Sequence, residues 1–521
     1  MTHGIAGGAF LFGHVGTVMA AEPEVAKPKL GELALSVQRV TLENGLRVVM
    51  NVDHGAPNIA VCVVYDVGSR NEVEGRSGFA HLFEHMMFQG SAHVPKGGHF
   101  TLISARGGTL NGTTSTDRTN YFEMLPASEL PLALWLEADR MKTLAVTREN
   151  VENQRAVVQE EYRMRVSNQA YAEGGIRLRA LAFDGYFPYS HDTIGSMADL
   201  DAAKFEYVSA FHDTYYAPDN AVLAIAGDFD PDVAMKLVEE DFGKAPKRKT
   251  VPVYTPPVLP EQTVPRRAEV RDTNARTPAL LVGFVIPPNR TKEHYALEIA
   301  GIVLGGDESS RLYQGLVRGD GKAESVGVWT YDQRGPDLFA LRAVLSDRGK
   351  LPEIETAIQT EIARLAKAGP TKAELEKAKT QVVSNFVFAL ESNQHRASEL
   401  AEYETYWGDA RLLARETENY QAVSAEEVRD AVAKYLTKTK QSTVSVLPPE
   451  GRGDTKDPKA TTPAAADPNA AKAPPKAPPV DSKAGAAPAT TPKAATTAVS
   501  PSGSAPKAAE PTKKAVKEGS P

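Results

Sequence analysis

The sequence is poor in cysteine, with Cys62 alone among 521 residues, and it has no excess of basic charge. A single cysteine excludes an intrachain disulfide and any zinc site built from cysteines. The net charge of −7 provides no basic field of the kind that binds nucleic acid, so we expect no nucleic-acid partner. Beyond the N-terminal region no run reaches the roughly 18 apolar residues that a membrane span needs, so we expect no transmembrane segment.

The C-terminal region lacks the residues that build a core. Residues 451–521 contain 19 alanines and 13 prolines but no Leu, Ile, Met, Phe, Tyr or Trp. Such a segment cannot bury enough apolar area to offset the entropy of ordering it. We therefore predict a disordered Ala/Pro/Lys-rich tail over residues 448–521. It is either a solvated spacer or, because it is mildly basic, a contact for anionic lipid or cell wall.

The N-terminal region has the composition of a targeting sequence. Residues 5–21 are apolar and rich in glycine, and residues 18–20 resemble a small-residue cleavage site. The basic region that usually precedes such a segment is missing, since the first Lys or Arg is Lys27. We interpret residues 1–21 as a signal segment. This predicts a periplasmic or cell-envelope location, with the cytoplasm as the alternative.

Between the two ends, the order of strands and helices repeats after roughly 200 residues. A proline-rich stretch, residues 247–265, separates residues 35–246 from residues 266–447. The repeated order predicts two similar domains joined by a linker. The capping patterns of Thr371 with Glu374 and of Ser424 with Glu427 predict two helix starts in the second half. Other expected elements are strands over 47–51, 59–65, 109–115, 120–125, 221–226 and 279–286, and helices over 79–88, 131–144 and 148–166.

Three ionisable residues lie together in the apolar segment 79–88. His81 and His85 are four residues apart, so on a helix both imidazoles lie on one face and could chelate one Zn²⁺. Glu84 projects to the same side and could act as a general base toward a water molecule. His-x-x-Glu-His is the inverted zincin motif. The alternative is a chance match in which both histidines are ordinary core or surface residues, but three ionisable groups in an apolar segment are costly without partners.

The motif is followed by two further stretches, Gly-Gly-Thr-Leu-Asn-Gly-Thr-Thr at 107–114 and Asn-Gln-Arg-Ala-Val-Val-Gln-Glu-Glu at 153–161. With residues 78–90, these stretches resemble the pitrilysin/insulinase family of inverted-zincin metallopeptidases, in particular its processing-peptidase-like bacterial branch. The resemblance covers about residues 40–447. It implies an α+β fold of two similar domains, each a mainly antiparallel sheet with helices packed on one side.

The resemblance also implies a ligand set for one Zn²⁺ per chain. His81, His85 and Glu161 would bind the metal, and Glu84 would be the general base. The family spacing selects Glu161 over Glu160, and Val151, Val158 and possibly Val157 mark the buried helix face that Glu161 would share. Relatives often carry a second acidic residue two turns earlier, where this chain has Gln154, which either orients a ligand or is a plain helix residue.

Other matching positions concern the substrate. The strand over 109–115 would bind the extended peptide through main-chain hydrogen bonds, with Asn111 near the scissile bond, or it is an ordinary hairpin strand. Phe88 would line the substrate pocket or belong to the core. In relatives an arginine and a tyrosine seven residues later grip the substrate. Here the arginine corresponds to Arg318, but the later position holds Ser325.

These features predict a zinc-dependent endopeptidase that hydrolyses extended or unfolded peptides. In relatives, two such chains pair to enclose a chamber. The missing tyrosine suggests a heterodimer with a related subunit that carries the Arg/Tyr pair, and the alternative is a self-sufficient homodimer. From a different functional class, the rival is a non-catalytic peptide-binding or structural subunit with the same fold. His93 and His99 follow the motif in a Gly/Pro-rich loop and are expected to be solvated.

Overall fold

Two sheets, one in each half of the chain, organise the residues that the computed structural model describes, which are 33, 35–247 and 254–450. The chain divides into residues 1–460 and 461–521, and every described residue belongs to the first of these units. The predicted signal segment, residues 248–253 of the predicted linker and residues 451–521 of the predicted tail lie outside the described residues.

The first sheet has six strands in the order β1-β2-β6-β3-β5-β4. Its neighbours are antiparallel except β2 and β6, which run parallel. The central strands β3 and β6 are buried on both faces, as their continuous apolar sequences predict. Strand β4 ends the sheet. The strands are β1 (Gln38–Thr41), β2 (Arg47–Val52), β3 (Asn58–Tyr65), β4 (Thr109–Thr114), β5 (Thr119–Pro126) and β6 (Ala221–Gly227).

The second sheet has five strands in the order β7-β11-β8-β10-β9. Strands β7 and β11 are parallel, and the other neighbours are antiparallel. Each sheet is therefore mainly antiparallel, with one parallel pair, and this confirms the expected α+β class. The strands are β7 (Arg266–Arg271), β8 (Ala279–Ile286), β9 (Ala323–Trp329), β10 (Asp337–Leu345) and β11 (Ser442–Leu447).

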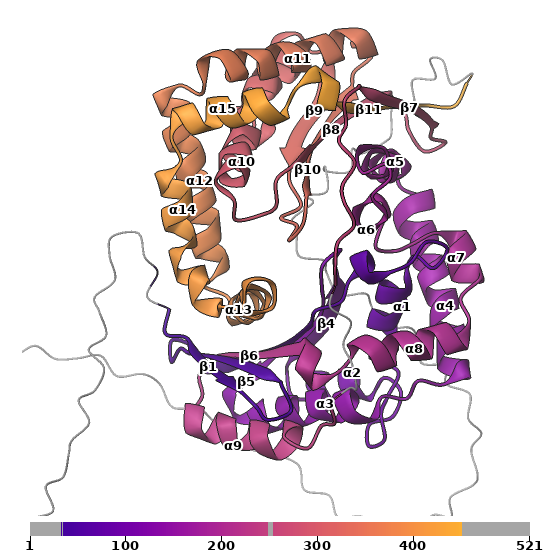
Figure 1. Ribbon diagram of the computed structural model, residues 1–521, viewed down its shortest axis with the longest axis vertical. Helices are drawn as coiled ribbons and strands as arrows, with labels where there is room; N and C mark the ends of the chain where they lie inside the picture. Colours follow the sequence, from indigo (N-terminus) through magenta and orange to yellow (C-terminus); the bar gives the residue numbers. More distant parts are fainter. Residues whose placement is uncertain (1–32, 34, 248–253, 451–521) are drawn as a thin grey trace, which may run out of the picture. The chain divides into compact units, whose positions relative to one another are not determined.

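The helices of each half cover one face of that half's own sheet. Figure 1 shows α3 and α9 beneath the first sheet and α10, α11 and α15 beside the second. In the first half the helices are α1 (Phe79–Met86), α2 (Gly98–Ser104), α3 (Leu130–Thr143), α4 (Arg148–Tyr162), α5 (Ala172–Ala182), α6 (Phe187–Ser190), α7 (Met197–Asp201), α8 (Phe205–Tyr215) and α9 (Pro231–Phe242). In the second half they are α10 (Lys292–Gly305), α11 (Leu351–Ala368), α12 (Lys372–Ala389), α13 (Asn393–Trp407), α14 (Glu416–Ala422) and α15 (Ala425–Tyr435).

The second face of each sheet is covered by a helix from the other half. Ala397, Leu400 and Ala401 of α13 join the buried residues of the first sheet, and Leu178 and Ala182 of α5 join those of the second. Figure 1 shows α13 lying over the first sheet and α5 beside β11 and β7. The two halves thus share two apolar cores.

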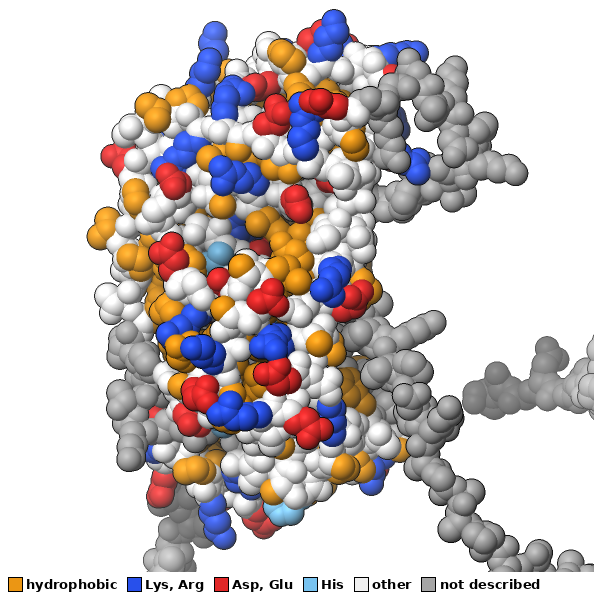
Figure 2. All heavy atoms as spheres, turned by 90° about the vertical axis from the view of Figure 1, so that its right-hand side faces the viewer, with side chains coloured by type: hydrophobic (Ala, Val, Ile, Leu, Met, Phe, Trp, Pro, Cys, Tyr) orange, Lys and Arg blue, Asp and Glu red, His pale blue; other side chains and the backbone are white. Residues whose placement is uncertain are grey.

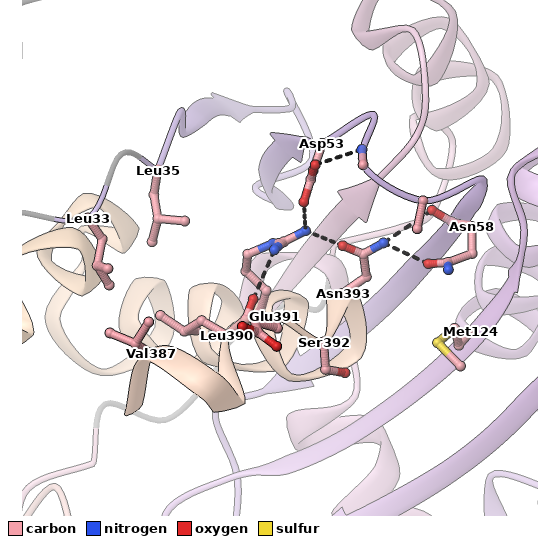
Figure 3. Close-up of a pocket in the computed structure, with 13 residues that line it drawn as sticks. Leu33, Leu35, Asp53, Asn58, Met124, Val387, Leu390, Glu391, Ser392 and Asn393 are labelled. Atoms are coloured by element: carbon pink, nitrogen blue, oxygen red, sulfur yellow. Dashed lines mark hydrogen bonds and ion pairs between the residues drawn. The ribbon is translucent and has the colours of Figure 1, made fainter. Parts of the chain in front are cut away.

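Polar contacts hold the start of α13 against the first sheet. Arg396 donates to Asp53 at 2.6 Å, and Asn393 donates to the side chain of Asn58 at 2.7 Å (Figure 3). These residues border a cavity of about 540 Å³ whose apolar wall includes Leu33 and Leu390. Arg396 is 6% exposed, so its charge is paired where the two halves meet.

Local sequence signals that predicted helix starts are confirmed. The side chains of Thr371 and Ser424 each accept the backbone N–H three residues later, completing both capping boxes. Asp230 caps α9. The expected helix over 148–166 is α-helical to Tyr162 and then becomes a π-helical turn over Arg163–Ser167.

The face drawn in Figure 2 carries no large patch of a single charge over the described residues. On the face drawn in Figure 2, Lys and Arg side chains alternate with Asp and Glu over the described residues, with apolar groups between them. None of the helices that the structure describes is long and apolar enough to cross a membrane.

Candidate metal centre and active site

Helix α1 carries the His-x-x-Glu-His motif, and its start is fixed by a buried carboxylate. Gly78 precedes the helix in a left-handed conformation (φ 88°), and a Cβ there would meet the Ile194 carbonyl oxygen at 2.7 Å. The helix has no side-chain cap from its own N-cap residue. Instead, Glu72 accepts the backbone N–H groups of Gly78 at 2.9 Å and Ala80 at 2.7 Å. His191 contacts Glu72 at 3.0 Å and thereby holds the carboxylate that positions the start of α1.

The motif histidines and Glu161 of α4 converge. The rings of His81 and His85 lie 4.9 Å apart on one face of α1. His85 Nε2 is 3.1 Å from Glu161 Oε2, and His81 Nε2 is 3.7 Å from Glu161 Oε1. The three donor atoms lie within 4.8 Å of one another. Two imidazoles and a carboxylate are a ligand set typical of catalytic zinc, which keeps a fourth position open.

The face of α4 separates Glu161 from its neighbour. Gln154, Val158 and Glu161 are buried together with Val151, whereas Glu160 is exposed and pairs with Arg163 at 2.9 Å. The helix therefore presents Glu161, and not Glu160, to α1. The expectation that Val157 lies on the buried side is wrong: its side chain is 44% exposed, because it sits about 100° around the helix from Val158.

Glu161 is ionised by its surroundings. Burial raises the pKa of this carboxyl, but the hydrogen bond to His85, the charges of both histidines and the charge of Arg165 together lower the pKa to about 2. Arg165 lies one turn later, with Nη1 2.8 Å from Glu161 Oε1, and is 47% exposed. The guanidinium of Arg165 therefore stabilises the ionised form of Glu161.

Glu84 is held by the edge strand. The Thr114 hydroxyl donates to Glu84 Oε2 at 2.6 Å. A Cβ added at Gly112 would approach the Glu84 Cγ to 3.1 Å, so the glycine gives this side chain room. Because side chains alternate along a strand, Gly112 and Thr114 share the face of β4 that points to α1.

The other predicted site residues are distributed differently. Asn111, on the opposite face of β4, accepts the backbone N–H of Gly112 at 2.9 Å. Phe88 is half-buried and packs against the rings of Phe100 at 4.9 Å and Tyr121 at 5.8 Å. Gln154 is 7% exposed on the same face of α4 as Glu161.

Arg318 lies in the second half of the chain and not on α1 or α4. It lies on a π-helical turn (Tyr313–Gly319), is 61% exposed, and pairs with Glu308 at 3.0 Å. Ser325 lies on β9 opposite Val344. The structure brings together His81, His85 and Glu161, with Glu84 on the same helix as the two histidines, but its described contacts do not join Arg318 to them.

Four contributors were not predicted from the sequence: Thr114, Arg165, Glu72 and His191. Alternation along β4 could have found Thr114, since it lies two residues beyond Gly112, but no spacing pointed to Glu72. The expectation for His99 was wrong. Its side chain is 1% exposed because it lies on the buried side of α2, where its Nε2 is 3.5 Å from the Leu136 carbonyl oxygen. Burial lowers the pKa of His99 to about 4.

Known proteins resemble both halves of the chain. Residues 47–180 match the family described as Insulinase (Peptidase family M16), and residues 203–382 match the Peptidase M16 inactive domain. An uncharacterized zinc protease of Mycobacterium tuberculosis is 31% identical over 423 residues, which are 80% of this chain and 94% of that protein. The chain belongs to peptidase family M16.

Other M16 proteins agree over the same span. Zinc protease PqqE of Helicobacter pylori is 28% identical over 415 residues, 79% of this M16 chain and 93% of that one. The crystal structure of a protease from Helicobacter pylori matches with a TM-score of 0.76 and 28% identity, covering 80% of this chain and all of that one. These relatives support a peptidase-like role and a general association with zinc.

Proposed function

We propose that this M16 chain is a zinc-dependent endopeptidase acting on extended or unfolded peptides. The observation that carries the proposal is the convergence of His81, His85 and Glu161 with their donor atoms within 4.8 Å. These three residues would hold one Zn²⁺. When bound, zinc would supply Lewis-acid polarisation of the scissile carbonyl and a lowered pKa for the attacking water.

Residues of the chain would carry out proton transfer and substrate binding. Glu84 would take the proton of the attacking water and return it to the leaving amine. The Thr114 hydroxyl would keep the Glu84 carboxylate turned toward the site. Strand β4 is the last strand of the first sheet, so its outer edge offers main-chain groups to an extended peptide. Asn111 and Phe88 are proposed to contact the substrate, and Gln154 to orient Glu161.

A matched pair on α4 tests the ligand assignment. Glu161→Gln should lose zinc on dialysis and lose peptide hydrolysis, because an amide oxygen is a neutral and weaker ligand. Glu160→Gln, one residue away and exposed, should retain both. Zinc content and cleavage of a quenched fluorescent peptide library measure the two effects. Equal zinc retention in the two variants would contradict the assignment.

A second candidate is a chain that keeps the fold but does not cleave peptides on its own. Arg318 is exposed and paired with Glu308, and Ser325 replaces the tyrosine of relatives. These features favour either a chain that cleaves only in a heterodimer with an Arg/Tyr-bearing subunit or a non-catalytic peptide-binding subunit. Analytical ultracentrifugation and pull-down from the native cell distinguish a homodimer from a heterodimer.

A periplasmic or envelope location, proposed from residues 1–21, is tested by cell fractionation.

A further inference from the structure

A second cluster of metal-ligand side chains lies in the other half of the chain. His294, Glu298 and Asp332 each offer a donor atom, and these atoms lie within 4.8 Å of one another. His294 is fully buried, Glu298 is half-buried and Asp332 is exposed. The cluster meets the same 4.8 Å limit as the one on α1 and α4, yet the peptidase chemistry does not use it.

Two elements bring the cluster together. Thr291 caps α10 and accepts the backbone N–H of His294, which sets His294 in the first turn. Glu298 follows one turn later on the same face. Asp332 comes from the loop between β9 and β10, in a left-handed conformation (φ 53°), and its backbone N–H donates to Asp337 at 3.0 Å.

Asp337 orients the imidazole. This fully buried carboxylate contacts His294 Nε2 at 2.9 Å and also accepts the backbone N–H of Leu338 at 2.6 Å. With Nε2 occupied, the other ring nitrogen, Nδ1, points at Glu298. Nδ1 is buried and lies 3.3 Å from Glu298 Oε2, with which it forms an ion pair when the imidazole is protonated. A histidine that is oriented by a carboxylate on one nitrogen and directs its second nitrogen at further acidic side chains has the arrangement that usually accompanies metal ligation.

The charge balance favours a cation. Glu298, Asp332 and Asp337 surround a single imidazole. Of the arginines near the cluster, Arg118 pairs with Glu402 and Arg290 pairs with Glu416, while Arg179 lies over the ring of Tyr331. A divalent ion would compensate the surplus carboxylates without new protein contacts.

An entry path exists through Asp332. This residue lines a cavity of about 410 Å³ that also includes Arg118, Glu402 and Thr114. An ion could therefore reach the cluster from solvent, while His294 remains buried. A hydrogen-bonded partner for the ligating histidine, here Asp337, and an entry path are both features expected of a real metal site.

We propose that His294 Nδ1, Glu298 and Asp332 form a second divalent-metal site, in the half of the chain opposite the α1–α4 cluster. One imidazole nitrogen and two carboxylate oxygens suit a first-row transition ion such as Zn²⁺ or Mn²⁺. The 3.3 Å between His294 Nδ1 and Glu298 Oε2 is close to the edge of roughly 3.4 Å in a zinc tetrahedron. The rival explanation is a protonated His294 shared by Asp337 and Glu298 with no metal.

The test uses the full chain with the α1 cluster removed. His81→Ala/His85→Ala is stripped with chelator and titrated with Co²⁺, followed by absorption and by metal analysis after dialysis. The proposal predicts two metal equivalents for the wild type and one for this double variant. Adding Glu298→Gln or Asp332→Asn should abolish the remaining equivalent.

Controls separate a lost site from a lost fold. Asp332→Asn alters an exposed side chain, so its unfolding temperature in chelator should match that of the parent. Asp192→Asn removes an acid from the wall of the same cavity, outside the cluster, and should keep the equivalent. A double variant that binds no Co²⁺ would overturn the proposal in favour of the protonated His294. So would an equivalent that survives both Glu298→Gln and Asp332→Asn. Because the readout is metal binding, either outcome is independent of peptidase activity.

Discussion

Glu84 owes its orientation to a hydroxyl that lies 30 residues further along the chain. Thr114 donates to it at 2.6 Å from the edge strand, while Thr113, on the opposite face of that strand, donates to Asn120 at 2.6 Å. A general base must be held in place to accept a proton efficiently. The strand that would bind the peptide therefore also positions the base that would cleave it.

Removal of the Thr114 hydroxyl tests this link. Thr114→Val should lower kcat about 10-fold with zinc content unchanged, in line with the usual cost of losing an orienting contact. Thr114→Ser keeps the hydroxyl and should restore the rate, and Thr113→Val should leave Glu84 undisturbed. Steady-state kinetics with one peptide substrate compare the three. A slow Thr114→Ser enzyme would show that packing, and not the hydrogen bond, matters at this position.

At the scale of single elements, the start of α12 shows how a cap and an ion pair combine. Glu374 accepts the backbone N–H of Thr371 at 2.8 Å and two hydrogen bonds from Arg311. The hydrogen bonds from Arg311 outweigh desolvation and lower the pKa of Glu374 to about 2, against an ordinary value of 4.5. A carboxyl with a lower pKa in the folded state stabilises the fold above the unfolded-state pKa.

The stabilisation should therefore disappear in acid. Glu374→Gln should lower the free energy of unfolding at neutral pH by on the order of 1 kcal/mol, a modest figure because the side chain is partly exposed and screened. The difference from wild type should shrink as the pH falls from about 4.5 toward 2. Urea unfolding between pH 7 and about pH 3 measures it. Glu376→Gln, on the exposed side of α12, is the control, and a pH-independent difference would contradict the account.

Local patterns predicted the elements better than they predicted the contacts between them. The spacing of His81 and His85 and the capping boxes depend on residues within one or two turns, so they can be read directly. The face of α4 distinguished Glu161 from Glu160 for the same reason. Thr114 and Glu72 act across elements, and the packing of α13 on the first sheet joins residues more than 300 positions apart, which no local periodicity encodes.

At the scale of the whole molecule, the exchanged helices make the two halves interdependent. Leu400 of α13 is fully buried against the first sheet although it belongs to the second half. Neither half alone would cover both faces of its own sheet. The described part of the chain should consequently unfold as one cooperative unit.

A pair of substitutions tests this cooperativity. Leu400→Ala should lower the free energy of unfolding by about 2–5 kcal/mol through the cavity it leaves. Its single transition should shift as a whole when followed by far-ultraviolet circular dichroism and by tryptophan fluorescence. Phe388→Ala removes a side chain that is 67% exposed and should change stability by less than about 0.5 kcal/mol. Separate transitions for the two probes would contradict the shared-core account.

The central claim is that the α1–α4 cluster makes this M16 chain a zinc peptidase, and one comparison tests it most directly. The purified, zinc-loaded chain and its Glu84→Gln variant are assayed alone on a quenched fluorescent peptide library, with the zinc content of both determined. We predict equal zinc in the two proteins and turnover that falls by about 10²–10⁴-fold in Glu84→Gln. Equal turnover by both proteins, or an absence of zinc from the wild type, would contradict the account.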